Sequence, residues 1–323
     1  MSAIEAVRAL GGDGVPDFMR GVEDRLAAAT RATSGLAADA ASETLAAGGK
    51  RLRPLLVYLS APLAGRDAPA LVAAATAVEL VHMATLVHDD VLDAAPLRRG
   101  RPTVWAAHGQ LVASAAGDYL FARAFAELAA TRDAVAVATL ARATLELAHG
   151  EAMQDAQTRQ PDTPVAAYLE RCRRKTGRLF AAACALGGRL GGLDEAGVAA
   201  LDRFGVELGL AFQLADDVLD CDGDPARTGK ALGTDLLEGV VTLPLLLAAA
   251  REPSVAAALR DRARPGDVLE LLGRVRACGA LSDARASAQA HARAARRSID
   301  GLRDRCDTDA LAAIVQRAVE RDS

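Results

Sequence analysis

The sequence predicts an all-α protein, and three observations support this fold class. Apolar residues recur at three-to-four spacing through most of the chain, and the helix-favouring residues Ala, Leu, Arg and Glu are abundant. No segment shows sustained β alternation or an Asn-Gly hairpin signal. Short polar breaks separate the helical stretches, most clearly at residues 62–69, 94–103, 158–164 and 221–235. We therefore expect ten or more helices joined by short polar segments.

The composition is typical of one folded domain. The 323 residues are 51% hydrophobic, which is enough for a large buried core. No tract rich in Pro, Ser or Gly divides them, and no low-complexity block is present. We predict a single domain over residues 1–323, with the informative motifs in about 45–250 and further helices in 251–323.

Charge and cysteine usage narrow the class of protein. A net charge of −4 gives no electrostatic case for nucleic-acid binding, so the expected partner is a small molecule. The five cysteines include no Cys-x-x-Cys pair, which suits a reducing compartment. There is no signal-peptide pattern and no run of about 18 uninterrupted apolar residues. We expect no transmembrane segment and a cytoplasmic location.

A helical stretch over residues 71–93 ends in the acidic pentad DDVLD, and the same pentad recurs at 216–220 after helical spacing in 206–219. The first and last aspartates of each pentad are four residues apart, so they share one helical face. At ~5 Å and an effective dielectric near 20, two such carboxylates repel by about 3 kcal/mol. A hard divalent cation such as Mg²⁺, shared with a substrate phosphate, relieves this repulsion. The repeated pentad therefore predicts a magnesium site.

Cations for phosphate binding lie close to the first pentad in the sequence. Arg98, Arg99 and Arg101 follow it in a loop, and residues 50–53 supply three more cations at the start of a helix opened by Pro54. Only three of the 38 basic residues are lysines, and each lies in a polar, glycine-marked stretch. A compact ammonium suits a phosphate oxygen, so we expect all three lysines at phosphate positions. The chain has no obvious Ser/His/Asp or Cys/His nucleophile, which favours catalysis by holding a leaving diphosphate.

Seven motifs in order make the chain resemble the trans-isoprenyl diphosphate synthases, the head-to-tail polyprenyl synthetase family. They are GGKRLRP at 48–54, DDVLD with RRGRPT at 89–103, GDYL at 117–120, GEAMQ at 150–154, KTGRLF at 175–180, FQLADDVLD at 212–220 and GKALGTDLLEG at 229–239. The resemblance implies the isoprenoid synthase fold, with helices around a central cavity, and a homodimer. It also implies three Mg²⁺ ions held between the two pentads and the diphosphate of an allylic substrate, either farnesyl or geranylgeranyl diphosphate, to which isopentenyl diphosphate is added.

The resemblance also assigns roles to particular residues. For the metals it implies Asp89, Asp93 and Asp216 as direct ligands, supported by Asp90, Asp217 and Asp220. For the allylic diphosphate it implies Arg98, Lys175 and Lys230. For isopentenyl diphosphate it implies Lys50, Arg53, His82 and Arg99. Near the developing cation it implies Thr176 and Gln213. One position departs from the pattern, because Val240 stands where many members have lysine.

Product length follows from the helix that leads into the first pentad. If the diphosphate lies at Asp89, the resemblance implies that the prenyl tail runs back past Thr85, Ala84, Val81 and Val78. A bulky aromatic at the position of Ala84 gives short products in the family, so alanine there predicts a long C30–C50 product. A C20 product is the alternative, because Met83, or Phe121 and Phe125 on a neighbouring helix, could close the pocket further on.

Three other functions share part of this sequence pattern. The Asp-x-Asp-Gly stretch at 220–223 matches the nucleophile loop of haloacid-dehalogenase-type phosphatases, but that loop must follow a buried β-strand. A non-catalytic subunit of a heteromeric synthase would have lost aspartates or lysines, and none is lost here except at Val240. A terpene cyclase would share the first pentad but would not need Lys50 and Arg53. We expect His88 to be structural, and Glu151 and Gln154 match the family without an assigned chemistry.

Overall fold

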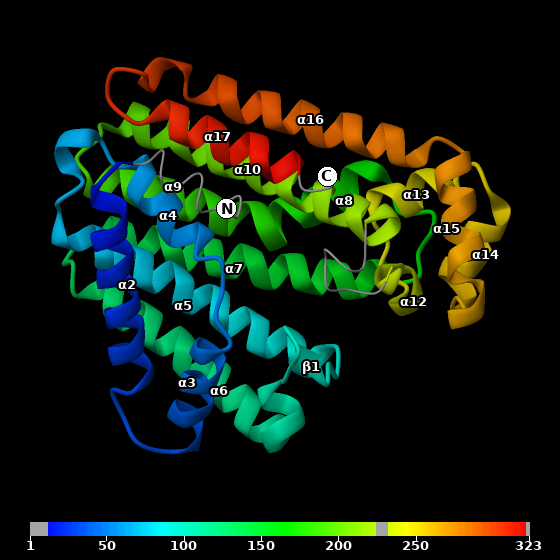
Figure 1. Cartoon of the computed structure of the whole chain (residues 1–323), viewed down its shortest axis with the longest axis horizontal. Helices are drawn as coiled ribbons and strands as arrows, with labels where there is room; N and C mark the ends of the chain where they lie inside the picture. Colours follow the sequence, from blue (N-terminus) through cyan, green and yellow to red (C-terminus); the bar gives the residue numbers. More distant parts are fainter. Residues whose placement is uncertain (1–11, 224–231, 321–323) are drawn as a thin grey trace. The chain divides into compact units, whose positions relative to one another are not determined.

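The computed structural model describes residues 12–223 and 232–320, and its fold is all-α apart from one small hairpin (Figure 1). These residues form two compact units. Unit 1 is the chain up to Thr144 with Ala182–Asp202 and Gly301–Leu311, and unit 2 is Leu145–Ala181, Arg203–Asp300 and the chain from Ala312 onward. The single domain expected from the sequence stays a prediction.

The regular elements agree with the helical pattern and its expected breaks. Unit 1 contains α2 (Gly14–Thr30), α3 (Leu36–Ala46), α4 (Leu52–Ser60), η1 (Leu63–Gly65), α5 (Pro69–Leu92), β1 (Leu97–Arg98), β2 (Arg101–Pro102) and α6 (Val104–Ala129). Unit 2 contains α8 (Val165–Cys172), the π-helical turn η2 (Arg173–Gly177), α12 (Thr234–Glu238), α13 (Leu243–Ala249), α14 (Pro253–Asp261), η3 (Pro265–Asp267), α15 (Val268–Ala277) and α16 (Ala280–Ser298). Residues of both units occur in α7 (Ala134–Gln157), α9 (Arg178–Leu190), α10 (Glu195–Asp222), η4 (Asp300–Leu302) and α17 (Thr308–Val319).

Helix α5 is the central helix of unit 1 and leads to the first pentad. It contacts α2, α3, α4 and α6, and Figure 1 shows it running beside α6. By length and composition α5 could cross a membrane, but 78% of its most apolar window is buried inside the protein. Because it is apolar on nearly every side and covered by neighbours, it is a core helix. The C-terminal end of such a helix gives the pentad a rigid support.

A two-residue hairpin follows the first pentad, where the sequence indicates only a polar break. Leu97 pairs with Pro102 and Arg98 pairs with Arg101 in antiparallel register. The turn residues Arg99 and Gly100 have φ values of 54° and 74°, and a type I′ turn requires positive φ at both positions. The strands are too short for visible alternation and Arg-Gly is a weak turn signal, so the sequence pattern does not reveal this hairpin.

The core of unit 2 is built from α8, α10 and the helices α13 to α16. Its fully buried residues include Tyr168, Leu210, Leu214, Leu245 and Leu272. Leu210 and Leu214 are four residues apart on α10, so they form one apolar stripe facing this core. The stripe leaves the residues between Leu214 and the end of α10 positioned by a packed helix. The second pentad lies in that segment.

Candidate active site

The three aspartates of the first pentad differ in burial at the end of α5. Asp90 is only 5% exposed, and its Oδ1 accepts a hydrogen bond from Arg98 Nε at 2.8 Å. Burial raises the pKa of Asp90, while the adjacent Arg98 opposes this rise. Asp89 is half-buried, and Asp93, the C-cap of α5, is exposed. Asp90 therefore ties the hairpin to the helix, and the flanking aspartates are the more accessible pair.

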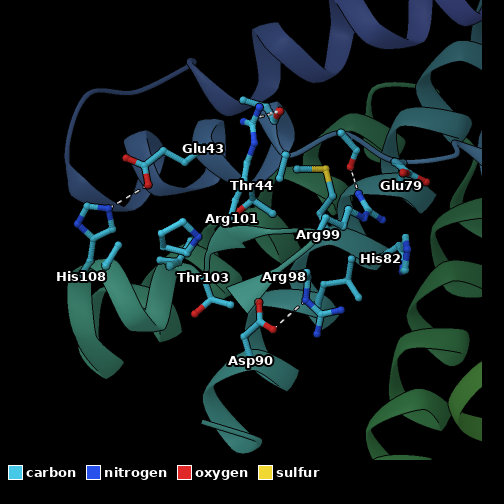
Figure 2. Close-up of a pocket in the computed structure, with 18 of the residues that line it drawn as sticks. Glu43, Thr44, Glu79, His82, Asp90, Arg98, Arg99, Arg101, Thr103 and His108 are labelled. Carbon is cyan, nitrogen blue, oxygen red and sulfur yellow. Dashed lines mark hydrogen bonds and ion pairs between the residues drawn. The ribbon is translucent and has the colours of Figure 1, made fainter. Parts of the chain in front are cut away.

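A cavity of about 470 Å³ lies beside the first pentad, between α3, α5, the hairpin and the start of α6 (Figure 2). Its volume is in the range of small-molecule sites. Its polar lining residues include Arg51, His82, Asp90, Arg98, Arg99 and Arg101. Figure 2 shows that Arg98 and Asp90 lie together on one side, with the Glu43–His108 ion pair on the other. Several guanidinium groups around one small cavity make an anion-binding site.

His82 lies among these arginines on α5. Burial, reinforced by Arg53, Arg99 and Arg98, lowers the pKa of His82 well below its usual value. The imidazole is therefore neutral, with one nitrogen that donates and one that accepts. A neutral imidazole forms hydrogen bonds without adding to the positive charge of the neighbouring arginines. This suits a pocket that binds an anion.

Two of the cavity arginines have a strained backbone conformation and are held in place by hydrogen bonds. Arg51 and Arg99 have φ values of 52° and 54°, a region that side chains other than glycine rarely adopt. Arg51 Nε donates to Glu23 at 2.6 Å and its Nη1 donates to Glu79 at 3.1 Å, which fixes it. Arg99 Nη1 donates to the carbonyl of Gly48. Strained residues that surrounding contacts hold in place are typical of functional sites.

The second pentad repeats the burial pattern of the first within unit 2. Asp217, its second aspartate, is 3% exposed, while Asp216 and Asp220 are half-buried. The Asp220 carboxylate accepts hydrogen bonds from the backbone N–H groups of Thr234 at 3.1 Å and Asp235 at 3.3 Å. Asp220 thereby anchors the start of α12 to the end of α10. In both pentads the second aspartate is the buried member.

A hydrogen-bond chain connects Asp217 to Thr176. Asp217 accepts from the Tyr168 hydroxyl and from Gln213 Nε2, the latter at 2.9 Å. Gln213 Oε1 accepts from Thr176 Oγ1 at 2.8 Å. Burial raises the pKa of Asp217 to about 6, and the bonds from Tyr168 and Gln213 act in the opposite direction. The chain fixes the amide of Gln213 so that its oxygen lies beside Thr176.

Lys175 lies in the π-helical turn η2, and π turns often occur at functional sites. Its Nζ is 2.6 Å from Glu151 Oε2, and Gln154 Nε2 donates to the other oxygen of Glu151 at 3.3 Å. A side chain at Gly150 would collide with the backbone of Lys175, so only glycine allows this approach. The GEAMQ motif therefore positions Lys175, a role that its sequence alone does not indicate.

The residues predicted to set product length are buried. Val78, Val81 and Ala84 are completely buried in α5, and Thr85 is 8% exposed.

Lys50 is exposed and Arg53 is half-buried, and neither is among the described residues that line the cavity. Burial, opposed by nearby Glu79, lowers the pKa of Arg53 to about 10. Lys230 lies outside the described residues, and Val240 is half-buried after α12.

The structure adds one residue that the sequence patterns do not reveal and gives two motif residues a contact or a place. Tyr168 joins the site through its hydrogen bond to Asp217, Glu151 pairs with Lys175, and Arg101 lines the cavity. Tyr168 and Glu151 are 49 and 24 residues from their partners Asp217 and Lys175, so local spacing carries no signal for either pair. His88 bonds to the Ser114 carbonyl at 3.3 Å and packs against Phe121 with ring centroids 5.6 Å apart, so the expected structural role fits.

The donor chemistry of the two pentads fits a hard divalent cation. Each offers carboxylate oxygens from two partly exposed aspartates around one buried, hydrogen-bonded aspartate. In the described parts of the chain, no three His, Cys, Asp or Glu side chains form a group that could enclose a metal by themselves. Mg²⁺ is commonly bound by one or two carboxylates together with water and substrate phosphate, which suits such open donors.

The phosphatase alternative does not agree with the fold. Asp220 and Asp222 of the Asp-x-Asp-Gly stretch lie in the last turn of the long helix α10, not after a β-strand. Asp222 is also held in ion pairs with Arg276 at 2.5 Å and Arg285 at 2.7 Å. An aspartate fixed in this way at a helix end lacks the strand-to-loop geometry that the phosphatase nucleophile requires.

Sequence comparisons relate the chain to known proteins over most of its length. The family model described as polyprenyl synthetase matches residues 35–270. Heptaprenyl diphosphate synthase component 2 of Geobacillus stearothermophilus is 42% identical over 255 residues, which cover 79% of this chain and 79% of that protein. Geranylgeranyl diphosphate synthase of Mycobacterium tuberculosis is 44% identical over 214 residues, which cover 64% of this chain and 61% of that protein.

A solved structure agrees with the all-α prediction. The crystal structure of a polyprenyl synthase from Caulobacter crescentus CB15, complexed with calcium and isoprenyl diphosphate, matches with a TM-score of 0.87 and 36% sequence identity. The match covers 99% of this chain and 98% of that one. The all-α fold class expected from the sequence is confirmed.

Proposed function

The chain belongs to the polyprenyl synthetase family and is a prenyltransferase, and on this premise we propose that it adds isopentenyl diphosphate head-to-tail to an allylic diphosphate. The main support for this proposal is the arginine-lined cavity beside Asp90, with neutral His82 among its cations. A diphosphate is a compact polyanion, and such a cavity offers several charge-assisted hydrogen bonds to it. Farnesyl or geranylgeranyl diphosphate is the proposed primer.

The proposed reaction breaks the carbon–oxygen bond of the allylic diphosphate and forms a new carbon–carbon bond. Pyrophosphate leaves, the double bond of isopentenyl diphosphate attacks the allylic cation, and the proton then lost passes to the departing pyrophosphate. Lys175, Arg98 and Lys230 would bind the allylic diphosphate, and Lys50, Arg53, His82 and Arg99 would bind isopentenyl diphosphate. Mg²⁺, held by Asp89, Asp93 and Asp216 with support from Asp90, Asp217 and Asp220, would supply charge neutralisation of the leaving group.

Thr176 and Gln213 would stabilise the positive charge that develops on the allylic carbon. Gln213 directs its Nε2 toward Asp217, so its carbonyl oxygen lies on the side of Thr176. Both oxygens keep lone pairs after their mutual hydrogen bond, and fixed dipoles of this kind need no reorganisation during the reaction. Lys175, positioned by Glu151 in the π turn, would hold the leaving diphosphate near these dipoles.

We propose a long-chain product, C30–C50, with C20 as the alternative. Relatives with long-chain and with geranylgeranyl products are both similar to this chain, so overall identity does not choose between them. The choice rests on Ala84, a small and completely buried residue of α5, past which the prenyl tail would run toward Val81 and Val78. We propose a cytoplasmic homodimer with three Mg²⁺ ions per active site. A relative named as a component of a synthase makes a heteromeric assembly the alternative.

The pure protein is expected to extend farnesyl diphosphate with radiolabelled isopentenyl diphosphate in the presence of Mg²⁺, and EDTA is expected to stop the extension. Chromatography of the dephosphorylated products measures chain length, and light scattering measures the oligomeric state. A folded protein with no extension would indicate a subunit that needs a partner chain. Hydrolysis to free alcohol without isopentenyl addition would indicate a phosphatase.

Lys175→Arg is expected to lower kcat/KM for the allylic diphosphate by about 10- to 100-fold, because a planar guanidinium cannot reproduce the compact ammonium seated against Glu151. Steady-state kinetics with varied farnesyl diphosphate measure the change. Arg173→Lys in the same π turn is the matched control, since Arg173 pairs with Glu170 at the surface and its loss should matter little. Equal activity of Lys175→Arg and wild type would contradict a phosphate role for Lys175.

A further inference from the structure

Arg159 follows α7 and has an unusual backbone conformation. Its φ of 62° lies in the left-handed region, which residues other than glycine seldom occupy. Its N–H donates to the carbonyl of Gly239 at 2.8 Å, which ties the end of α7 to the end of α12. A strained arginine held by a long-range backbone bond has a position that its surroundings determine.

Gly239 provides a seat for the Arg159 side chain. A Cβ atom added to Gly239 would lie 2.6 Å from Arg159 Cγ and 3.1 Å from its Nε, so no larger residue fits there without displacing the arginine. Gly239 is itself buried and has a φ of 79°, which disfavours other residues. The aliphatic stem of Arg159 therefore lies close to Gly239.

The seat lies one short helix away from the second pentad. The Asp220 carboxylate accepts hydrogen bonds from the backbone N–H groups at the start of α12, and Gly239 is the C-cap of the same helix. The five residues of α12 span about 7.5 Å at 1.5 Å per residue. Asp220 and Gly239 both belong to unit 2, so this distance lies within one unit.

The charged side chains of this region are engaged in different ways. Asp216, Asp217, Asp220 and Asp235 lie within the same segment of unit 2. Arg171 is engaged through its Nη2 with the Val241 carbonyl, and Lys175 is paired with Glu151. Among the described residues Arg159 forms no ion pair, although it is half-buried. A half-buried guanidinium with no protein anion is suited to an anionic ligand.

We propose that Arg159 is a substrate-binding residue that contacts the diphosphate group bound at the second pentad, in the allylic substrate and in the pyrophosphate product. It supplies a positive charge beside Gly239, where the next residue, Val240, is uncharged. This inference rests on the proposed function and adds one residue to its diphosphate site. Arginine suits the position because its guanidinium is long, permanently charged and able to bind two phosphate oxygens at once.

The test measures binding of pyrophosphate in the presence of Mg²⁺ by isothermal titration calorimetry, together with the KM for farnesyl diphosphate. Arg159→Met keeps an aliphatic stem on Gly239 and removes the charge, while Arg159→Lys keeps the charge. Arg297→Gln on the exposed face of α16 is the control for loss of one arginine, since Arg297 is remote in sequence and exposed. Val240→Lys in the Arg159→Met background tests whether a cation at the neighbouring position restores binding.

Arg159→Met is expected to weaken pyrophosphate binding and to raise the KM about tenfold, the effect of one lost charge-assisted contact. Arg159→Lys and the double variant with Val240→Lys are expected to recover most of the affinity, and Arg297→Gln is expected to match wild type. Unchanged affinity in Arg159→Met, an equal loss in Arg159→Lys, or no recovery with Val240→Lys would overturn the proposal. A wild-type protein that transfers no prenyl group would refute the proposed function, whereas the calorimetric series tests Arg159 separately.

Discussion

Replacing Asp89 or Asp216 by alanine is expected to lower turnover at least ~10³-fold while the helical fold stays intact, because each change removes a ligand for charge that develops on the leaving diphosphate. Both side chains are partly exposed at helix ends, so neither substitution leaves a large buried cavity. Steady-state turnover at saturating substrate and Mg²⁺ measures the loss, and circular dichroism with thermal unfolding measures the fold.

The buried aspartate of the second pentad provides the contrast. Asp217→Ala removes the acceptor for the Tyr168 hydroxyl and for Gln213, so it is expected to lower the free energy of unfolding by about 1–3 kcal/mol as well as turnover. Asp216→Ala is expected to lower turnover without a comparable loss of stability. Turnover within tenfold of wild type in either Asp89→Ala or Asp216→Ala would show that the two pentads do not act as metal ligands.

Ala84→Phe is expected to shorten the product to about C15–C20 without abolishing transfer, because it fills space along the proposed tail path and touches no phosphate contact. Ala84 is completely buried in α5, so the extra volume costs stability, typically about 1–3 kcal/mol in a packed core. Thermal unfolding must therefore accompany the product analysis, which uses chromatography of the dephosphorylated prenols.

A graded series makes this test sharper. Val81→Phe and Val78→Phe place the same ring about one and two turns further from the pentad, at about 5.4 Å per turn. Product length is expected to increase in the order Ala84→Phe, Val81→Phe, Val78→Phe and wild type. An unchanged product in the folded Ala84→Phe variant, or a wild-type product of C15, would show that the tail takes another route.

Sequence reasoning predicted the all-α class and the positions of the main breaks because helical periodicity is a local property. The polar stretches at 94–103 and 158–164 do interrupt helices, and the two pentads do end α5 and α10. The family was also recognisable from the chain alone, since seven motifs in a fixed order are a strong signal even without coordinates. The small hairpin after the first pentad was missed, because a turn of Arg99 and Gly100 depends on φ angles that the residue pattern does not specify.

Other features depended on contacts between residues far apart in the chain. The two copies of DDVLD have identical letters, and only packing decides that Asp90 and Asp217 are the buried aspartates and which groups bond to them. The same holds for the ion pair of Glu151 with Lys175 and for the seat of Arg159 on Gly239. Sequence by itself determined the chemistry that this protein can offer, because residue type sets charge and donor capacity. The tertiary structure decided how each group is used, because burial and long-range hydrogen bonds fix which atoms are already engaged and which protonation state they prefer.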